Sequence, residues 1–342
     1  MQRSAFDNSN EETNMRNAGL ANLLKVSALL LCAASLLGAP ARAEDWPTHA
    51  VRIIVPYPPG GNADGLARLV GDGLSRKLQA NFVVENRPGG TGMVGTEAVA
   101  RAEPDGYTLL LGTYSTFATL PVLSKMSPEP LDIIDVVGGV AGYVPVLAVS
   151  KQLNVATLEE LIALAKGDPG KLTFGSVGVG ASSHINGEIL QHAAGIDMLH
   201  VPFKGSNQSV TALMGGQIDV LIDGVTVAAA KSGRVVPLAA FYKSRHEELP
   251  DVPTAEEAGV PVRLPTGPTF GVFAPKGVAP GIMAKLQDAL ESVTNDPEFH
   301  TKAVALSLTS DWTNAADFRR ALEADLEFNR AFLPTIGLGT SQ

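Results

Sequence analysis

Apolar residues in this chain fall into short runs of the extended type that alternate with segments of helical spacing. Within residues 63–78, for example, Leu66, Val70 and Leu74 recur at helical spacing. The extended runs predict strands at 51–55, 82–85, 107–112, 144–149, 172–175, 198–202, 218–223, 235–240 and 269–274. This alternation predicts an α/β fold with mostly parallel sheets and helices on both faces.

Polar residues mark the starts of several predicted helices. Thr157 with Glu160, and Thr254 with Glu257, match the capping box, in which two side chains reciprocally hydrogen-bond two backbone amides. The other predicted helices lie at 184–194, 225–231, 280–293 and 315–332.

Two extended segments, 142–150 and 263–274, are predicted to cross between two domains. The first domain is then discontinuous and comprises residues 44–146 and 266–342, the second comprises 147–265, and residues 1–43 precede both. Two α/β domains joined by two strands leave a cleft, which is a common ligand site and closes by hinge motion. We therefore expect a two-lobed molecule with an interdomain cleft.

The start of the chain has the layout of a cleavable signal peptide. Lys25 precedes the apolar run 26–37, and Ala41-Arg42-Ala43 follows it with small residues at both ends. The run is too short for a membrane span, and no later apolar run reaches about 18 residues without Gly, Pro or charge. We expect export to the periplasm with cleavage near Ala43.

The charge balance excludes some partners. The 342 residues carry a net charge of −9, of which residues 1–43, with four basic and three acidic side chains, contribute +1, so the cleaved chain would carry −10. An acidic chain without a basic cluster is a poor nucleic-acid binder. It also cannot attract an anionic ligand by its overall charge, so any anion site must be local.

Metal and cofactor motifs are missing from the sequence. The single cysteine, Cys32, lies in the predicted signal peptide, and the six histidines show no metal-ligand spacing beyond a loose pair, His184 and His192. The glycine-rich segment 175–180 departs from the dinucleotide-binding fingerprint, and no phosphate-loop motif occurs. We therefore expect neither a metal nor a cofactor.

The first candidate ligand loop combines rigid prolines with paired glycines directly after a strand. Glycines let backbone N–H groups approach a ligand closely, and an acid near the next helix start favours its exposed amides. Two interpretations stay open: a carboxylate held by backbone donors at a helix N-terminus, or an ordinary turn with a helix cap. The candidate contacts here are Tyr57, Pro58, Gly60, Gly61 and Asp64.

A second candidate loop, 175–184, also joins a strand to a helix and is rich in glycine and serine. Its composition favours recognition of a second anionic group by backbone amides and hydroxyls. Adjacent Ser and His at one helix start do not point at each other as in a catalytic triad, so a hydrolase is the weaker alternative and no catalytic residue is predicted. The candidate contacts are Gly178, Gly180, Ser182, Ser183 and His184.

The remaining candidates lie at other strand ends. Lys204 and Gly205 form a third strand–loop–helix corner, where Lys204 either meets an anion or is solvated. Asp223 ends the run 218–223 and either receives a donor from the ligand or caps the next helix. Thr113 and Ser115, after the run 107–112, complete the candidate ligand contacts.

Seven segments, taken in order, resemble the solute receptors of tripartite tricarboxylate transporters, often called Bug receptors. Together they run through nearly the whole of the cleaved chain. The segments are Tyr57–Asp64, Glu85–Gly89, Pro104–Leu109, Gly175–His184, His200–Gly205, Gly215–Asp219 and Leu249–Thr254. The chain departs from the family where Thr269-Phe270 replaces an aromatic pair, and where Ala279 replaces the usual Thr before Pro280.

The resemblance implies a type II-like, two-domain periplasmic binding protein without enzymatic activity. It implies that the Gly60–Gly61 loop and the Gly178–His184 loop grip opposite ends of a small carboxylate or related organic acid. A membrane permease would receive the ligand, and we expect the receptor to be a monomer. A sensor that signals to a membrane kinase, or a hydrolase using Ser183 and His184, are the alternatives.

Overall fold

The computed structural model describes residues 46–124, 126–265 and 267–339. The predicted signal peptide and Cys32 lie outside the described residues. No helix within these described ranges is long and apolar enough to cross a membrane.

The first sheet has six strands in the order β11-β4-β10-β3-β1-β2. Its strands are β1 (Val51–Val55), β2 (Phe82–Asn86), β3 (Thr108–Thr113), β4 (Ile134–Gly142), β10 (Phe270–Pro275) and β11 (Thr309–Asn314). β1 runs parallel to β2 and β3, whereas β10 runs antiparallel to β3 and β4, and β11 runs antiparallel to β4.

The second sheet has five strands in the order β7-β6-β8-β5-β9. Its strands are β5 (Val146–Ser150), β6 (Thr173–Ser176), β7 (Leu199–Pro202), β8 (Val220–Asp223) and β9 (Val235–Ala240). β6 runs parallel to β7 and β8, and β5 runs antiparallel to β8 and β9.

Both sheets are mixed, so the expectation of mostly parallel sheets was wrong. The chain passes directly from β4 into β5, and from β9 to β10, without a helix in between. Each passage leads from one sheet into the other, and the strands at its ends, β4, β5, β9 and β10, are ones that pair antiparallel with their neighbours.

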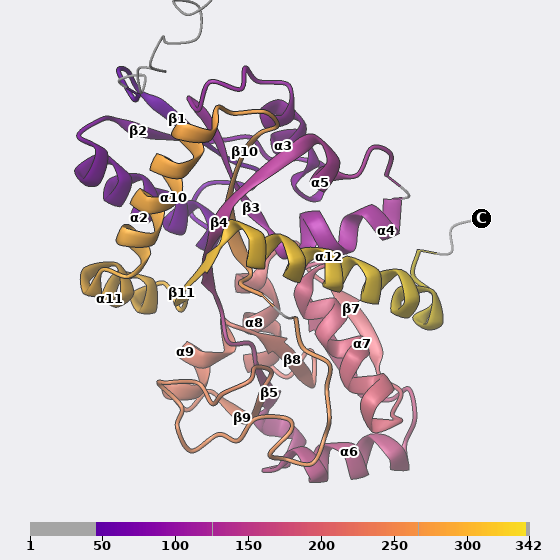
Figure 1. Ribbon diagram of the computed structural model, residues 1–342. Coiled ribbons are helices and arrows are strands. Elements are labelled where there is room, and N and C mark those ends of the chain that lie inside the picture. The colour runs from indigo at the N-terminus through magenta and orange to yellow at the C-terminus, as the bar shows by residue number, and fades with distance from the viewer. Residues whose placement is uncertain (1–45, 125, 266, 340–342) are drawn as a thin grey trace, which may run out of the picture. The chain divides into compact units, whose positions relative to one another are not determined.

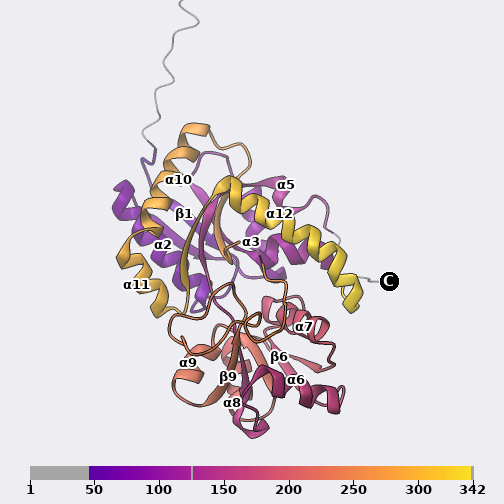
Figure 2. The ribbon, with the colours of Figure 1, turned by 60° about the horizontal axis from the view of Figure 1, so that its bottom comes forward.

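Helices pack on both sheets (Figure 1; Figure 2). With the first sheet lie α2 (Asn62–Leu78), α3 (Met93–Ala100), α4 (Leu120–Ser124), α5 (Pro130–Ile133), α10 (Pro280–Thr294), α11 (Pro297–Ala305) and α12 (Ala315–Phe332). With the second sheet lie α6 (Leu158–Gly167), α7 (Ser182–Ala194), α8 (Ser206–Met214) and α9 (Thr226–Lys231). A π-helical turn, η2 (Ser115–Thr119), follows β3, and a 3₁₀ turn, η4 (Leu333–Ile336), follows α12.

Each sheet has its own apolar core. In the first, Phe117 stacks on Phe273 with ring centroids 4.0 Å apart, and Phe318 of α12 closes the cluster. In the second, Phe174 of β6 packs with Leu161 of α6. These large side chains are fully buried, which is the main favourable term in folding.

Both predicted caps form, but only the Thr254–Glu257 pair is a complete capping box and only Thr157 begins a helix. Glu160 accepts from the Ala156 amide at 2.7 Å instead of the Thr157 amide. Thr157 accepts a hydrogen bond from the Glu160 amide at 3.1 Å and caps α6. Thr254 and Glu257 bond each other's amides at 3.1 and 2.8 Å, yet the segment 254–259 is a turn. Gly259 has φ +83°, which ends the turn before it can extend into a helix.

Candidate functional site

The predicted contacts lie at the carboxyl ends of strands from both sheets. β1 and β3 of the first sheet, and β6 and β8 of the second, lead into the loops that carry them. In open α/β sheets, ligands bind outside these strand ends.

The loop after β1 presents the N-terminus of α2 without a side-chain cap. Gly61 is the N-cap residue, and no side chain hydrogen-bonds the first amides of the helix. Gly60 has φ +85°, and a Cβ added at Gly60 or Gly61 would meet no atom within 4 Å. The loop therefore leaves open space at Gly60 and Gly61 beside first-turn amides of α2 that have no intrahelical acceptor, as an anion site requires.

Asp64 stabilises this loop through hydrogen bonds. Its carboxylate accepts hydrogen bonds from the Gly60 amide at 3.1 Å, from Asn86 at 3.0 Å and from Arg68 at 3.0 and 3.1 Å. Burial raises the pKa of Asp64, but these hydrogen bonds outweigh it and the pKa is lowered. The carboxylate and the Gly60 amide thus bind each other.

Tyr57 joins the same loop to the end of β3. Its hydroxyl lies 2.6 Å from Thr113 Oγ1 and 3.3 Å from Thr116 Oγ1, and its carbonyl accepts from Asn86 at 3.1 Å. Pro58 is exposed next to it. The first sheet therefore offers hydroxyl groups beside the uncapped N-terminus of α2.

The loop after β6 presents a second uncapped helix. Ala181 is the N-cap residue of α7, and no side chain bonds the first amides. Gly180 has φ +79°, and a Cβ there would lie 2.2 Å from Leu123 Cδ1 of α4, so the loop approaches the first sheet's helices closely. Gly178 has open space at its Cβ position.

Ser183 and His184 hold this loop in place. Ser183 Oγ accepts from the Val177 amide, and His184 Nδ1 accepts from the Gly180 amide, both at 3.1 Å. The two side chains thus bind different amides and not each other, which is not the geometry of a nucleophile and its base. Both side chains are buried. Among the predicted ligand contacts, these two therefore serve to position the loop.

His184 stacks on His200 beneath the loop, with centroids 3.9 Å apart. Because Nδ1 of His184 accepts a hydrogen bond, its proton lies on Nε2, which is 3.5 Å from Glu188 Oε1. Burial, followed by the neighbouring His184, lowers the pKa of His200 to about 4, so His200 is neutral at pH 7. The stacked pair supports the loop from beneath.

Ser182 connects the two sheets. Its hydroxyl lies 3.2 Å from Ser115 Oγ at the start of η2. Ser182 also hydrogen-bonds Tyr143, which lies on the short link from β4 to β5. Burial, followed by the charge of Asp223, raises the pKa of the Tyr143 phenol.

Asp223 lies at the end of β8, opposite Val146 of β5. Its carboxylate accepts from the Val225 amide at 3.1 Å, and also from the Gly224 amide and the Ser206 hydroxyl. Burial raises the pKa of Asp223 to about 6 despite these bonds. The residue is thus a buried acid held only by neutral donors.

Lys204 and Gly205 precede a third helix N-terminus. Gly205 is the N-cap residue of α8, again without a side-chain cap. The Lys204 side chain is exposed, and its amide bonds Gln208 Oε1 at 3.3 Å.

The structure thus brings most of the predicted contacts together. Tyr57, Thr113, Ser115, Ser182 and Asp223 are connected through direct contacts or through Tyr143. Thr116, Tyr143 and Ser206 belong to the same group but were not predicted, because no local pattern marks a lone hydroxyl whose partner is distant in sequence. Among the described residues, the basic side chain that lies beside these groups is Arg68, which pairs with Asp64.

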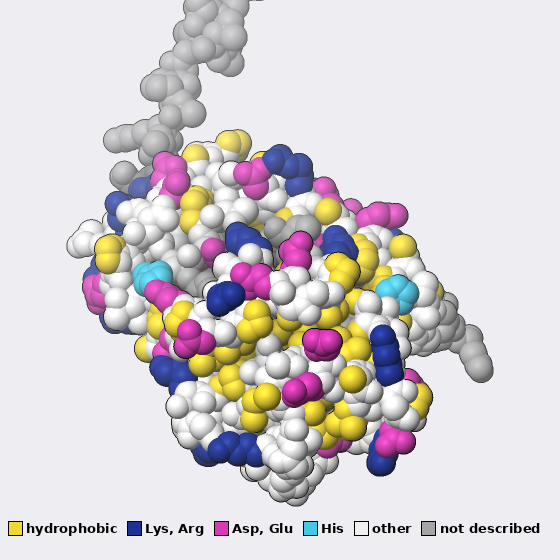
Figure 3. Space-filling model, turned by 90° about the horizontal axis from the view of Figure 1, so that it is seen from below, with side chains coloured by type: hydrophobic (Ala, Val, Ile, Leu, Met, Phe, Trp, Pro, Cys, Tyr) yellow, Lys and Arg dark blue, Asp and Glu magenta, His cyan; other side chains and the backbone are white. Residues whose placement is uncertain are grey.

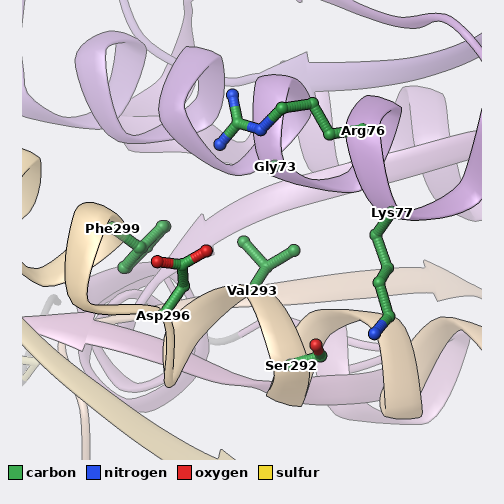
Figure 4. A pocket seen from close by; sticks show the side chains of 7 residues that line it. All are labelled: Gly73, Arg76, Lys77, Ser292, Val293, Asp296 and Phe299. Carbon is green, nitrogen blue, oxygen red and sulfur yellow. The ribbon is translucent and has the colours of Figure 1, made fainter.

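A pocket of about 310 Å³ lies elsewhere, between α2 and the α10–α11 pair (Figure 4). Arg76, Lys77 and Asp296 line it with both signs of charge. Arg76 is four turns along α2 from Gly61, about 20 Å at 1.5 Å per residue. The pocket is therefore separate from the group of hydroxyls and helix ends.

On the face seen from below, acidic and basic side chains are interspersed, and neither sign forms a large continuous patch (Figure 3). No group of three or more His, Cys, Asp or Glu within the described ranges could hold a metal ion.

Comparison with known proteins decides the family. Residues 66–338 match the model of the tripartite tricarboxylate transporter family receptor. The chain belongs to this receptor family. BugT of Bordetella pertussis is 35% identical over 283 residues, covering 80% of this chain and 86% of that protein.

Solved structures of relatives share the fold. An R. palustris protein determined with adipate has a TM-score of 0.74 at 29% identity, covering 86% of this chain and 99% of that one. MatC from Rhodopseudomonas palustris, determined with malate, has a TM-score of 0.73 at 27% identity, covering 84% and 99%. These comparisons confirm the predicted two-lobed α/β fold and the predicted family. Receptors of this family are periplasmic binding proteins.

Proposed function

We propose that this receptor captures a small organic anion, such as a dicarboxylate, between the loops after β1 and β6. One observation carries the proposal: α2 and α7 belong to different sheets, both begin without a side-chain cap, and their surroundings meet at the Ser115–Ser182 contact. Each uncapped terminus offers N–H groups and a positive dipole end to one carboxylate. Relatives determined with adipate and malate support this ligand class.

The structure changes which amides we assign to the ligand. The Gly60 and Gly180 amides already donate to Asp64 and His184. The donors we propose are therefore the first-turn amides that follow Gly61 and Ala181. Hydroxyls of Tyr57, Thr113, Ser115 and Ser182, with bridging waters, would complete the site.

We propose that the captured anion passes to the membrane permease of a tripartite transporter, and that the receptor acts as an exported monomer cleaved near Ala43. Residues 44–146 with 266–342 would form one domain, and 147–265 the other. No turnover of the ligand is proposed, because Ser183 and His184 both serve the loop.

A thermal-shift screen of organic acids against the cleaved protein tests the function. A ligand at 100 times its dissociation constant should add about 2.7 kcal/mol to the free energy of unfolding. Stabilisation by dicarboxylates, but not by amines or neutral sugars of the same size, is the expected result. If no carboxylate shifts the melting temperature, the proposed ligand class is wrong.

A further inference from the structure

Asp223 stands out as a buried acid in a site suited to anions. It is 9% exposed and lies among the residues that connect the two sheets. The charge of Asp223 raises the pKa of Tyr143, and Tyr143 itself hydrogen-bonds Ser182. The two residues are neighbours, since a Cβ at Gly224, next to Asp223, would lie 3.3 Å from the Tyr143 ring. Asp223 is thus one side chain away from the Ser182–Ser115 contact.

No cation compensates this carboxylate among the described residues. Its hydrogen bonds come from Ser206, Gly224 and Val225, all of them neutral donors. A carboxylate that stays ionised in such surroundings repels a second carboxylate brought close to it. An anionic ligand and an ionised Asp223 therefore compete.

The described helices and strands that pack on β8 place no titratable side chain against Asp223. β5, β6 and α8 carry no ionisable side chain. On α7, His184 faces Glu188 and His192 packs against Phe332. On α9, Lys231 pairs with Glu248, and the exposed Lys204 precedes α8. The phenol of Tyr143, on the β4–β5 link, is the titratable group that faces Asp223.

We propose that Asp223 takes up one proton from solvent when an organic anion binds, and thereby selects ligands that can accept a hydrogen bond from its carboxylic acid. This inference rests on the proposed function. The free protein carries an ionised Asp223 above pH 6, and the complex carries the neutral acid, whose O–H donates to a ligand oxygen. One proton enters per ligand bound, and no covalent bond of the ligand changes.

The sign of the pH dependence follows from this linkage. The bound anion raises the pKa of Asp223 above its free value of about 6. Between the two pKa values binding takes up a proton, so affinity falls as pH rises above 6 and stays level below it. A fully coupled site loses tenfold in affinity for each pH unit in this window.

Calorimetric titration of the whole cleaved receptor with malate and with adipate, at pH 6 and pH 8, tests the inference. Both acids are mostly ionised over this range. We expect at least tenfold weaker binding at pH 8. We also expect proton uptake approaching one per ligand, read from titrations in two buffers of different ionisation enthalpy. This proton count uses the unmodified receptor and needs no variant.

Asp223→Asn supplies a variant that mimics the neutral acid. Its amide can donate to the ligand at any pH, so it should bind at pH 8 about as tightly as the unmodified receptor binds at pH 6. Asp251→Asn, an exposed acid in a turn, is the matched control and should keep the full pH dependence.

The results of these titrations distinguish proton uptake by Asp223 from the proposed binding of dicarboxylates. Equal affinity at both pH values without proton uptake, or a pH dependence that persists in Asp223→Asn, overturns the inference and leaves the proposed function intact. If neither acid binds at either pH, the dicarboxylate function is wrong and the inference goes with it.

Discussion

At the scale of single residues, the proposed site depends on backbone shape more than on charged side chains. Gly61 leaves the first amides of α2 open, whereas Lys204 is an exposed side chain at the edge of a different loop. Anion recognition by helix ends provides about 0.3–1 kcal/mol from each terminus, and more when partly buried. Several such donors with waters can reach micromolar affinity, about −8 kcal/mol.

Gly61→Val should weaken organic-acid binding at least tenfold, because its side chain fills the space through which a carboxylate reaches the amides. Lys204→Ala should change affinity less than threefold. Isothermal titration of both variants measures the difference. If Lys204→Ala abolishes binding while Gly61→Val leaves it unchanged, a direct ion pair must replace the backbone site.

Asp223 should also make the stability of the ligand-free receptor depend on pH. Its folded pKa of about 6 lies above the ordinary value of 3.8 for an aspartate carboxyl, so the folded state binds the proton more tightly. The contribution of Asp223 to the free energy of unfolding therefore falls as pH rises from about 4 to 6, by about 3 kcal/mol. Asp223→Asn should raise the melting temperature at pH 8 relative to the unmodified receptor, and not at pH 4. An equal effect at both pH values would contradict the raised pKa.

At the scale of elements, α7 serves the site and the contact between the sheets at once. Its first turn carries the uncapped amides, and Ile185 and Ile189 pack with Phe332 and Leu333 at the end of α12. The middle of α7 lies on Phe174 of β6. The direction in which its amides point is thus fixed by packing from both sheets.

At Gly187, α7 approaches its sheet closely. A Cβ at Gly187 would lie 2.3 Å from the Phe174 ring, which is fully buried and cannot move aside. We expect Gly187→Ala to lower the free energy of unfolding by about 1–3 kcal/mol, despite the better helix propensity of Ala. Gly167→Ala in α6, where a Cβ meets nothing within 4 Å, is the control and should be neutral or stabilising in urea melts. Equal stability of the two variants would contradict the tight packing.

At the scale of the whole molecule, the two sheets are linked through a partly buried ion pair. Arg263, in the segment between β9 and β10, bonds Asp325 of α12 at 2.9 Å and lies over the Phe328 ring at 4.0 Å. The Asp325 side chain is 1% exposed, whereas that of Arg263 is 34% exposed. Tyr242, after β9, also bonds Asp311 of β11 at 3.0 Å.

Asp325→Asn should lower the free energy of unfolding by about 2–4 kcal/mol, since it leaves Arg263 with an unmatched charge in a partly buried position. Glu327→Gln, which removes an exposed ion pair with Arg330 one turn away, should cost less than about 0.5 kcal/mol. Thermal melts of both variants provide the comparison. A loss of stability in Glu327→Gln equal to that in Asp325→Asn would contradict this ranking.

Ligand binding should bring the two lobes together, because each contributes one helix N-terminus to the proposed site and two segments connect them. Small-angle scattering with and without an acid identified in the thermal-shift screen would show a smaller radius of gyration in the complex. An unchanged radius would count heavily against hinge closure.

Most strands, several helices and the two glycine-rich loops could be predicted from the sequence, whereas α3, α4, α5 and α11 were not predicted. Local composition predicted nine strands, among them β1 and β9 at their observed bounds, and α12 likewise. β4 and β11 were missed: β4 contains Gly138-Gly139, which weakens the strand pattern but leaves room for the Trp312 and Phe318 rings, and β11 is a polar edge strand. Strand periodicity is local, so it is readable without knowledge of neighbours.

Strand direction, and the meeting of side chains distant in sequence, could be known from the folded chain alone. The extended segments at the two passages were predicted, but the antiparallel pairing of the strands beside them was not, because pairing depends on strands distant in sequence. Asp64, Ser183 and His184 were predicted as ligand contacts, but each hydrogen-bonds an amide of its own loop. Tyr143, Ser182 and Ser115 are far apart in sequence, and folding alone places them together. The effect of burial on Asp223 likewise depends on every element packed around it, which composition cannot reveal.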